Sequence, residues 1–210
     1  MLIKVCGMRE ADNIRAVDAL SIDFMGFIFW PHSSRYVAAL PACLPQRAKR
    51  VGVFVDADMA DLLQHVTQYG LHAVQLHGHE SPAYMRCLRE GQRSTLNAQR
   101  STLIKAFNIA TPNDLEQTVP YEGLADYFLF DTKGPSVGGN GKQFDWTVLN
   151  AYNGTTPFLL SGGIGPDDAP RIRSFHHPLL AGIDLNSRFE TSPAVKDINQ
   201  LNNFIKTIRQ

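Results

Sequence analysis

The sequence predicts one α/β domain, a (β/α)8 barrel that spans residues 1–210. Eight short apolar segments are separated by stretches with helical periodicity, and several of these segments end in polar side chains or glycine. Crossover helices require the strands that they join to be parallel, and eight such units close a barrel. An open doubly wound sheet is the structural alternative, but no Gly-x-Gly-x-x-Gly motif follows the first apolar segment.

The predicted strands are continuous apolar runs of the kind that a parallel sheet buries on both faces. They cover residues 2–5, 22–29, 50–55, 73–76, 103–107, 127–131, 157–160 and 181–185. Each run is bounded by glycine or by polar residues, which are common where a strand meets a loop.

The predicted helices follow apolar residues that recur every three or four positions. They cover residues 10–20, 44–49, 59–69, 82–89, 111–118, 144–152 and 192–208. Gly70 and Gly91 are expected to end two of them as C-caps. Because the chain is short for this fold, several helices must be short or missing, notably the one after the fifth strand, which Pro120 interrupts.

Charge and composition exclude several classes of protein. Lys plus Arg and Asp plus Glu number 20 each, so the formal net charge is zero, which argues against a nucleic-acid partner. No apolar run reaches the ~18 residues of a membrane span and no signal-peptide core is present, so we expect a cytoplasmic protein without a membrane partner. The expected partner is a small-molecule substrate, and the expected assembly is a monomer or a homodimer.

Two polar residues at strand ends are the candidate catalytic groups, because this fold carries its chemistry at the C-terminal ends of strands. Cys6 reads equally well as a small buried side chain or as a base or nucleophile. A reactive Cys6 needs its thiolate, and moving an ordinary pKa near 8.5 to neutrality takes roughly 2 kcal/mol, which a nearby cation could supply. Asp131 ends an apolar strand before a glycine-rich loop, which favours catalysis over a structural cap.

Two further loops predict binding of an anionic substrate. Gly162 and Gly163 follow the seventh strand and Asn186 and Ser187 follow the eighth, where barrels frequently bind phosphate through backbone N–H groups. Arg35 is either a solvated surface residue or a bidentate ligand of a substrate carboxylate.

The histidines do not predict a metal site. His77 and His79 flank Gly78 without metal-ligand spacing to a third candidate, so packing and hydrogen bonding are the expected roles. Cys6, Cys43 and Cys87 are widely spaced and form no metal-like pair, which favours a reducing compartment.

Short motifs along nearly the whole chain resemble those of the phosphoribosylanthranilate isomerase family. They lie in family order at residues 4–8 (KVCGM), 26–29 (GFIF), 34–36 (SRY), 51–54 (VGVF), 74–78 (VQLHG), 130–131 (FD), 138–141 (GGNG), 144–146 (FDW), 161–164 (SGGI) and 184–190 (DLNSRFE). As a set in this order, these motifs are specific. The family commonly has proline before the arginine of the third motif, where this chain has Ser34.

The resemblance implies an activity in tryptophan biosynthesis. The expected reaction is the Amadori rearrangement of N-(5'-phosphoribosyl)anthranilate to 1-(2-carboxyphenylamino)-1-deoxyribulose 5-phosphate, the third step from chorismate, without metal or cofactor. Matched motifs make Cys6 the general base, Asp131 the general acid and Arg35 the ligand of the anthranilate carboxylate. Asp184 would face the substrate, and Gly139, Gly141, Gly162, Gly163, Asn186 and Ser187 would surround its phosphate.

Two other functions remain as alternatives at this level. Another sugar-phosphate isomerase or epimerase barrel is disfavoured because the His and Asp ligands of a metal-dependent epimerase are absent from the motifs. A binding-only barrel is disfavoured because phosphate binding requires neither Cys6 nor Asp131. One phosphate region also predicts a monofunctional enzyme, since the related histidine-pathway substrate carries two phosphates.

Overall fold

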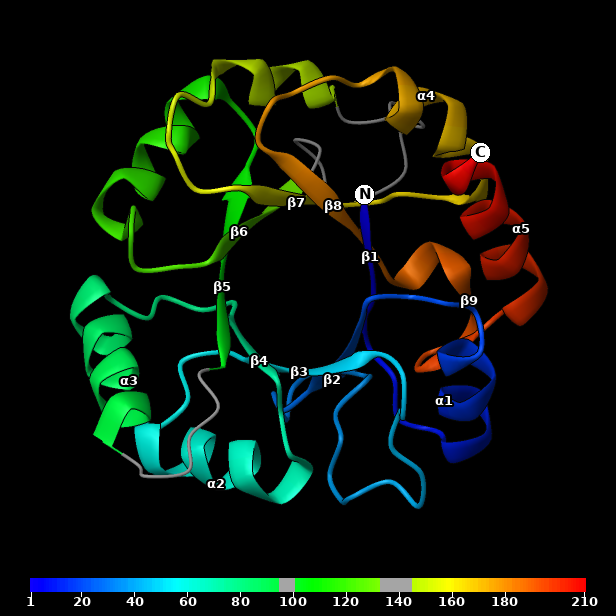
Figure 1. The fold of residues 1–210 in the computed structure, drawn as a ribbon, viewed down its shortest axis with the longest axis horizontal. Helices are drawn as coiled ribbons and strands as arrows, with labels where there is room; N and C mark the ends of the chain where they lie inside the picture. Colours follow the sequence, from blue (N-terminus) through cyan, green and yellow to red (C-terminus); the bar gives the residue numbers. More distant parts are fainter. Residues whose placement is uncertain (95–100, 133–144) are drawn as a thin grey trace.

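The computed structural model describes residues 1–94, 101–132 and 145–210, and its eight parallel strands form a closed barrel in sequence order (Figure 1). The prediction of a (β/α)8 barrel is therefore confirmed. The strands are β1 (Leu2–Val5), β2 (Phe24–Ile28), β3 (Lys49–Phe54), β4 (Ala73–Leu76), β5 (Thr102–Ile109), β6 (Tyr127–Thr132), β7 (Phe158–Ser161) and β8 (Leu180–Leu185).

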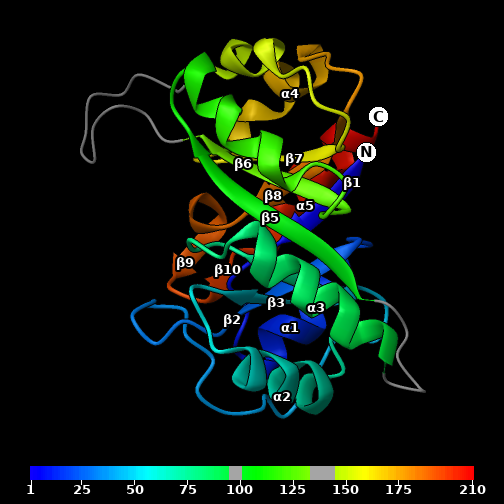
Figure 2. The ribbon, with the colours of Figure 1, turned by 90° about the vertical axis from the view of Figure 1, so that its left-hand side faces the viewer.

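Helices surround this ring of strands (Figures 1 and 2). The α-helices are α1 (Ala11–Asp18), α2 (Met59–Tyr69), α3 (Pro82–Ser94), α4 (Ala169–Ser174) and α5 (Ile198–Arg209). The 3-10 helices are η1 (Pro112–Tyr121), η2 (Trp146–Ala151), η3 (Pro166–Asp168) and η4 (Ser187–Phe189). Among the described residues, no helix combines the length and the apolar character needed to cross a membrane.

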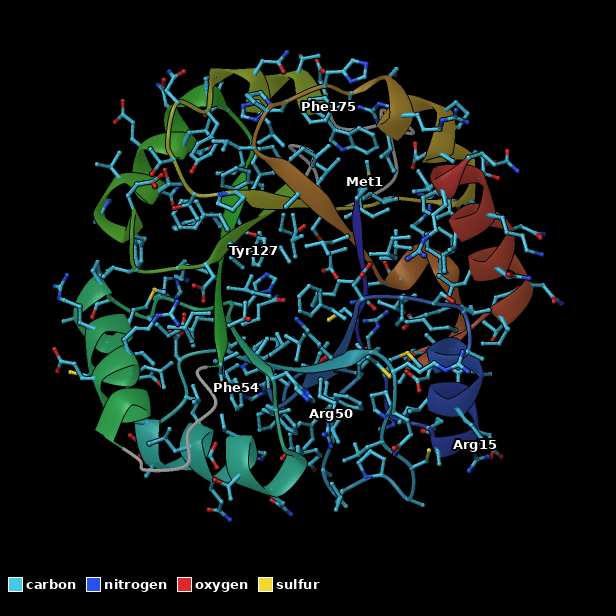
Figure 3. All side chains as sticks on the ribbon, in the orientation of Figure 1. Met1, Arg15, Arg50, Phe54, Tyr127 and Phe175 are labelled. Atoms are coloured by element: carbon cyan, nitrogen blue, oxygen red, sulfur yellow. The ribbon has the colours of Figure 1, made fainter. Side chains whose placement is uncertain are left out.

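Side chains from the strands fill the interior of the ring (Figure 3). The barrel interior holds one buried apolar cluster, and a larger cluster packs the outer faces of the strands against the helices. The interior cluster consists of Phe24, Val51, Ala73, Ile104, Ala106, Leu129 and Leu159. Because this cluster closes the barrel from within, the polar residues at the strand ends form a rim above a dry core.

The loop between β2 and β3 lacks the helix expected over residues 44–49. Lys49 already belongs to β3, and the backbone before it is held by the carboxylate of Asp18 at the end of α1. Asp18 accepts hydrogen bonds from the N–H groups of Gln46 at 2.8 Å, Arg47 at 3.1 Å and Ala48 at 2.8 Å. These N–H groups are satisfied by a side chain, so the segment needs no helical ladder.

The two glycines expected to end helices behave differently. Gly70 caps α2 with a left-handed φ of 53°, and its N–H points to the carbonyls of Val66 and Thr67, as predicted. Gly91 lies inside α3, which continues to Ser94, so the predicted C-cap at Gly91 is wrong. A glycine in a helix interior costs only about 1 kcal/mol relative to alanine, and the amphipathic pattern of α3 overrides it.

The helix expected over residues 192–208 begins six residues later. An antiparallel hairpin of β9 (Glu190–Ser192) and β10 (Val195–Lys196) precedes it, and Pro193 and Ala194 make the turn, with a φ of 68° at Ala194. Helix α5 starts after Asp197, whose carboxylate accepts a hydrogen bond from the N–H of Gln200 at 3.0 Å. This hairpin lies beside the first strands of the barrel and contributes two side chains to the rim.

Helical segments after β5 and β6 are both 3-10 helices. Helix η1 runs through Pro120 to Tyr121, three residues beyond the predicted end, and Thr111 and Asp114 form a capping box at its start. Helix η2 covers part of the predicted segment 144–152, whose first residue lies outside the described ranges. The prediction that Pro120 interrupts the helix after the fifth strand is therefore wrong, because a 3-10 helix of 10 residues runs through it.

Candidate active site

Cys6 lies directly after β1, and its side chain is buried against β2. Its N–H donates a hydrogen bond to the carbonyl of Leu185 at 2.9 Å, which ties this position to β8. On β2, Gly26 faces the thiol so closely that a Cβ atom there would lie 2.7 Å from the Cys6 sulfur. A side chain at residue 26 would therefore displace the sulfur, and glycine keeps its place open.

Lys4 and Asp184 form a buried ion pair next to Cys6. Lys4 is two residues before Cys6 and hence on the same face of its strand, and its register partner on β8 is Asp184. The Lys4 Nζ lies 2.8 Å from Asp184 Oδ1, and the two side chains are 0% and 7% exposed. Asp184 Oδ2 accepts a hydrogen bond from the Ser161 hydroxyl at 3.3 Å, so β7, β8 and β1 are connected through polar side chains.

Opposing effects act on the Cys6 thiol. Burial raises the pKa of Cys6, and the charge and hydrogen bond of Lys4 lower it, while the charge of Asp184 raises it further. Lys196 is a second cation that lowers this pKa. Burial prevails and the pKa of Cys6 stays above its usual range, so any base role for Cys6 depends on these lysines.

Arg35, Glu190 and Lys196 form a second charged cluster beside Cys6. The methylene groups of the Arg35 side chain lie against Gly7, where a Cβ atom would be 2.5 Å from Arg35 Cδ. Arg35 Nε donates to Glu190 Oε1 at 2.9 Å, and Lys196 Nζ lies 2.6 Å from the same oxygen. Lys196 Nζ also donates to Asn186 Oδ1 at 2.8 Å.

The carboxylate at the centre of this cluster is held in its charged form. Burial opposes ionisation of Glu190, but the hydrogen bonds from Arg35 and Lys196 outweigh it and lower the pKa of Glu190. The same hydrogen bond raises the pKa of Arg35. Because Glu190 occupies the edge of the guanidinium formed by Nε and Nη2, Arg35 has only its Nη1 side left for a ligand.

Asp131 lies near the end of β6, where its register partners are Ser161 on β7 and Asn108 on β5. His77 Nε2 lies 3.7 Å from Asp131 Oδ2, beyond hydrogen-bond distance. The Gln75 amide Nε2 lies 2.9 Å from His77 Nδ1, so the two side chains are hydrogen-bonded and the other ring nitrogen, Nε2, is the one that faces Asp131. The expected hydrogen-bonding role of His77 is thus confirmed.

A pocket of about 440 Å³ opens beside Asp131 at the ends of β3, β4 and β5. His77 and Asn108 line it together with Lys105 of β5 and Tyr121 at the end of η1. Within the described ranges no group of three or more His, Cys, Asp or Glu side chains could hold a metal ion.

The predicted phosphate loops after β7 and β8 lie side by side. Gly162 and Gly163 have left-handed φ values of 95° and 67°, which side chains rarely adopt. A Cβ atom at Gly165 would lie 3.4 Å from the guanidinium of Arg188, which joins the two loops. Asn186 and Ser187 start η4, whereas Gly139 and Gly141 lie outside the described residues.

The structure thus brings Cys6, Arg35 and Asp184 together on the β8–β1–β2 side and connects them to Asp131 through Ser161. Sequence reasoning assigned no role to Lys4, Glu190 or Lys196. The two-residue spacing from Lys4 to Cys6 was a usable signal for a shared strand face. Lys196 was hidden by the helix predicted over residues 192–208, whereas Glu190 ends the motif at residues 184–190 and was given no role there.

Comparisons with known proteins agree on the family. The family model for N-(5'-phosphoribosyl)anthranilate (PRA) isomerase matches residues 3–207. The N-(5'-phosphoribosyl)anthranilate isomerase of Parabacteroides distasonis is 50% identical over 99% of this chain and 93% of its own length.

Two solved structures share the fold over the whole chain. The phosphoribosyl anthranilate isomerase of Thermotoga maritima is 29% identical, with a TM-score of 0.80, and the alignment covers 100% of this chain and 98% of that one. An isomerase in complex with reduced 1-(o-carboxyphenylamino)-1-deoxyribulose 5-phosphate has the same TM-score at 27% identity and the same coverage. The chain therefore belongs to the phosphoribosylanthranilate isomerase family.

Proposed function

We propose that the rim of this barrel performs the family reaction with Cys6 as general base and Asp131 as general acid. The reaction converts N-(5'-phosphoribosyl)anthranilate to 1-(2-carboxyphenylamino)-1-deoxyribulose 5-phosphate in tryptophan biosynthesis. The observation that carries the assignment is the continuous row of polar side chains from Asp131 through Ser161 and Asp184 to Lys4 and Cys6. Membership of the family supports this reaction over the epimerase and binding-only alternatives.

The acid step opens the sugar ring. Protonated Asp131 gives its proton to the furanose ring oxygen, and the bond from that oxygen to C1′ breaks. The nitrogen lone pair forms the C=N bond of a Schiff base as the ring opens. His77 Nε2 faces the Asp131 carboxylate that this step produces, at a separation of 3.7 Å from Oδ2. A small approach of the two side chains would make that contact a hydrogen bond.

The base step completes the rearrangement. The Cys6 thiolate takes the proton from C2′, and the electron pair of that C–H bond forms a C1′=C2′ double bond while the nitrogen regains its lone pair. The resulting enolamine tautomerises to the ketone product. A positioned acid and a positioned base each contribute roughly 10²–10⁴-fold to such a reaction.

The remaining rim residues suit the two anionic ends of the substrate. Arg35 would bind the anthranilate carboxylate through Nη1, because Glu190 occupies its other edge. Gly162, Gly163 and the start of η4 would surround the phosphate together with residues 139–141. A relative holds a reduced carboxyphenylamino-deoxyribulose phosphate, which has the same two anionic ends.

A direct assay tests the proposal. Phosphoribosylanthranilate generated in situ should lose its anthranilate-type fluorescence when the intact protein is added. Cys6→Ser and Asp131→Asn should each lower kcat by roughly 10²–10⁴-fold. Exposed Cys87→Ser is the matched control and should keep full activity. Full activity of a Cys6→Ser/Asp131→Asn double variant would overturn the assignment of both residues.

A further inference from the structure

We propose that Lys4, held in place by Asp184, is the positioning residue that stabilises Cys6 as a thiolate. The inference rests on the proposed base role of Cys6 and deepens it. Lys4 would not touch the reacting atoms, because its ammonium already lies against the Asp184 carboxylate at 2.8 Å. It would act through its positive charge, which lowers the pKa of the neighbouring Cys6 thiol on the same strand face.

Burial makes the charge of Lys4 unusual. Its side chain is 0% exposed, and an ammonium taken out of water is costly unless a counter-ion accompanies it. Burial lowers the pKa of Lys4, but Asp184 and Cys6 outweigh this effect and keep the pKa above its usual range. The lysine therefore remains a cation at the strand position nearest to the thiol on the same face.

The arrangement suits a base that gains and loses a negative charge. When Cys6 is a neutral thiol, Asp184 neutralises Lys4 by itself. When Cys6 is a thiolate, the Lys4 ammonium has two anionic neighbours, Cys6 and Asp184. The Ser161 hydroxyl donates a hydrogen bond to Asp184 Oδ2, the oxygen that does not contact Lys4. Removing the lysine would leave the thiolate next to an unneutralised carboxylate, so the thiol would hold its proton more tightly.

A second buried lysine supplies a matched control. Lys105 on β5 is 3% exposed, and its Nζ lies 3.2 Å from Glu80 Oε2. Its Nζ also donates to the carbonyl of Gly78 at 2.8 Å. This pair has the same chemistry as Lys4 and Asp184, but Lys105 lies on β5, across the barrel from β1 and Cys6.

The test is a titration of the Cys6 thiol in the full chain, with Cys43→Ser and Cys87→Ser so that one cysteine remains. Ultraviolet thiolate absorbance against pH gives its apparent pKa. Lys4→Met should raise this pKa by about 1 unit or more, and Asp184→Asn should lower it, because it removes an anion beside the thiol. Lys105→Met/Glu80→Gln should leave it unchanged.

Two further variants show whether a change in the thiol pKa comes from the lost charge or from damage to the fold. Lys4→Arg should retain most of the wild-type thiol pKa, and Lys4→Met/Asp184→Asn removes both charges together and should give an intermediate value. If Lys4→Met and Asp184→Asn move the pKa in the same direction, or if neither moves it, the proposal is wrong.

The titration uses no substrate and therefore stands apart from the proposed reaction. In turnover, Lys4→Met should move the acidic limb of the kcat–pH profile upward by the same amount as the thiol titration. A shifted titration with an unshifted profile would show that Lys4 controls the thiol while Cys6 is not the base. An unshifted titration with an active enzyme would overturn the role of Lys4 and leave the proposed reaction intact.

Discussion

The two sides of the rim are built differently. On the β8–β1–β2 side, Cys6 lies among two buried lysines, each paired with its own carboxylate at 2.8 Å and 2.6 Å. On the β4–β6 side, the side chains of Asp131 and His77 are 18% and 29% exposed, and Asp131 Oδ2 lies 3.7 Å from His77 Nε2. We call these the base side and the acid side of the rim. On the base side the charged groups form close, buried ion pairs. On the acid side the two side chains are partly exposed to solvent and lie beyond hydrogen-bond distance of each other.

The chemistry of the two groups explains this difference. A base must be present as the less stable thiolate, and in a buried site only nearby cations can stabilise that charge. An acid must be present as the neutral carboxylic acid, which needs no counter-ion. A fixed charge beside the reacting group is therefore useful for Cys6 and unnecessary for Asp131. The following substitutions test whether the asymmetry has these causes.

Glu190→Gln should have the largest effect on stability, because it removes the negative charge that Arg35 and Lys196 share on the base side. Lys196 is 0% exposed and would lose its counter-ion, and Arg35 would lose the acceptor of its Nε group. Breaking a buried pair from one side typically costs about 3–5 kcal/mol. Urea unfolding measures the loss. Glu10→Gln, which breaks an exposed pair with Arg9, should change stability by less than about 1 kcal/mol.

The same variant should also respond differently to pH. The folded protein lowers the pKa of Glu190 below its unfolded value, so the stability that this group contributes is present above about pH 4.5 and is lost as pH falls through the folded pKa. The gap in unfolding free energy between wild type and Glu190→Gln should therefore shrink below that pH. A gap that stays constant down to pH 3 would mean that the Glu190 charge does not stabilise the fold.

Gly26→Ala should have an intermediate effect, confined to the base side. The added methyl group would lie 2.7 Å from the Cys6 sulfur and 3.2 Å from its Cα, so the thiol or its strand must shift. Overpacking of this kind costs about 1–3 kcal/mol, and we expect kcat to fall about tenfold or more because the base is displaced. Stopped-flow or steady-state fluorescence assays measure the change in kcat.

Gly91→Ala is the control for this substitution. Among the residues that the structure describes, no atom lies within 4 Å of the place of its added methyl group, and a helix interior favours alanine. It should stabilise the protein by about 0.5–1 kcal/mol without changing kcat. Equal kcat values for Gly26→Ala and wild type would mean that the position of the sulfur is not critical.

The barrel itself was predictable because each strand is a continuous apolar run, and this signal is local. The hairpin β9–β10 was not, because Val195, Ile198 and Leu201 repeat at helical spacing although Val195 belongs to a strand. Pro193 and the positive φ of Ala194 break the helix there. A spacing rule that counts apolar residues does not register either effect.

The positions of the two proposed reacting groups were predictable, but the side chains that contact them were not. Cys6 and Asp131 follow apolar runs, so their places at the strand ends could be read directly. The contact between Lys4 and Asp184 joins residues 180 positions apart, and that between Arg35 and Glu190 joins residues 155 apart. Barrel closure and strand register create both pairs, and no short segment of sequence contains them.

Gln75→Met should have the smallest effect on stability and would test the acid side alone. Within the described residues, Gln75 Oε1 is buried without a hydrogen-bond partner, so methionine removes an unsatisfied acceptor while nearly conserving volume. It also removes the contact of the amide with His77 Nδ1, a ring that water can still reach. We expect stability to change by less than about 1 kcal/mol.

The kcat of Gln75→Met shows whether the orientation of His77 toward Asp131 matters for the reaction. Without Gln75, His77 is free to change tautomer and to turn its unprotonated nitrogen toward Asp131, so kcat should fall by a factor of about 2–10, within the range of one neutral hydrogen bond. Exposed Gln64→Met on α2 should change neither stability nor kcat. An unchanged kcat in Gln75→Met would mean that His77 needs no fixed tautomer, and that the acid side relies on the substrate alone to organise Asp131.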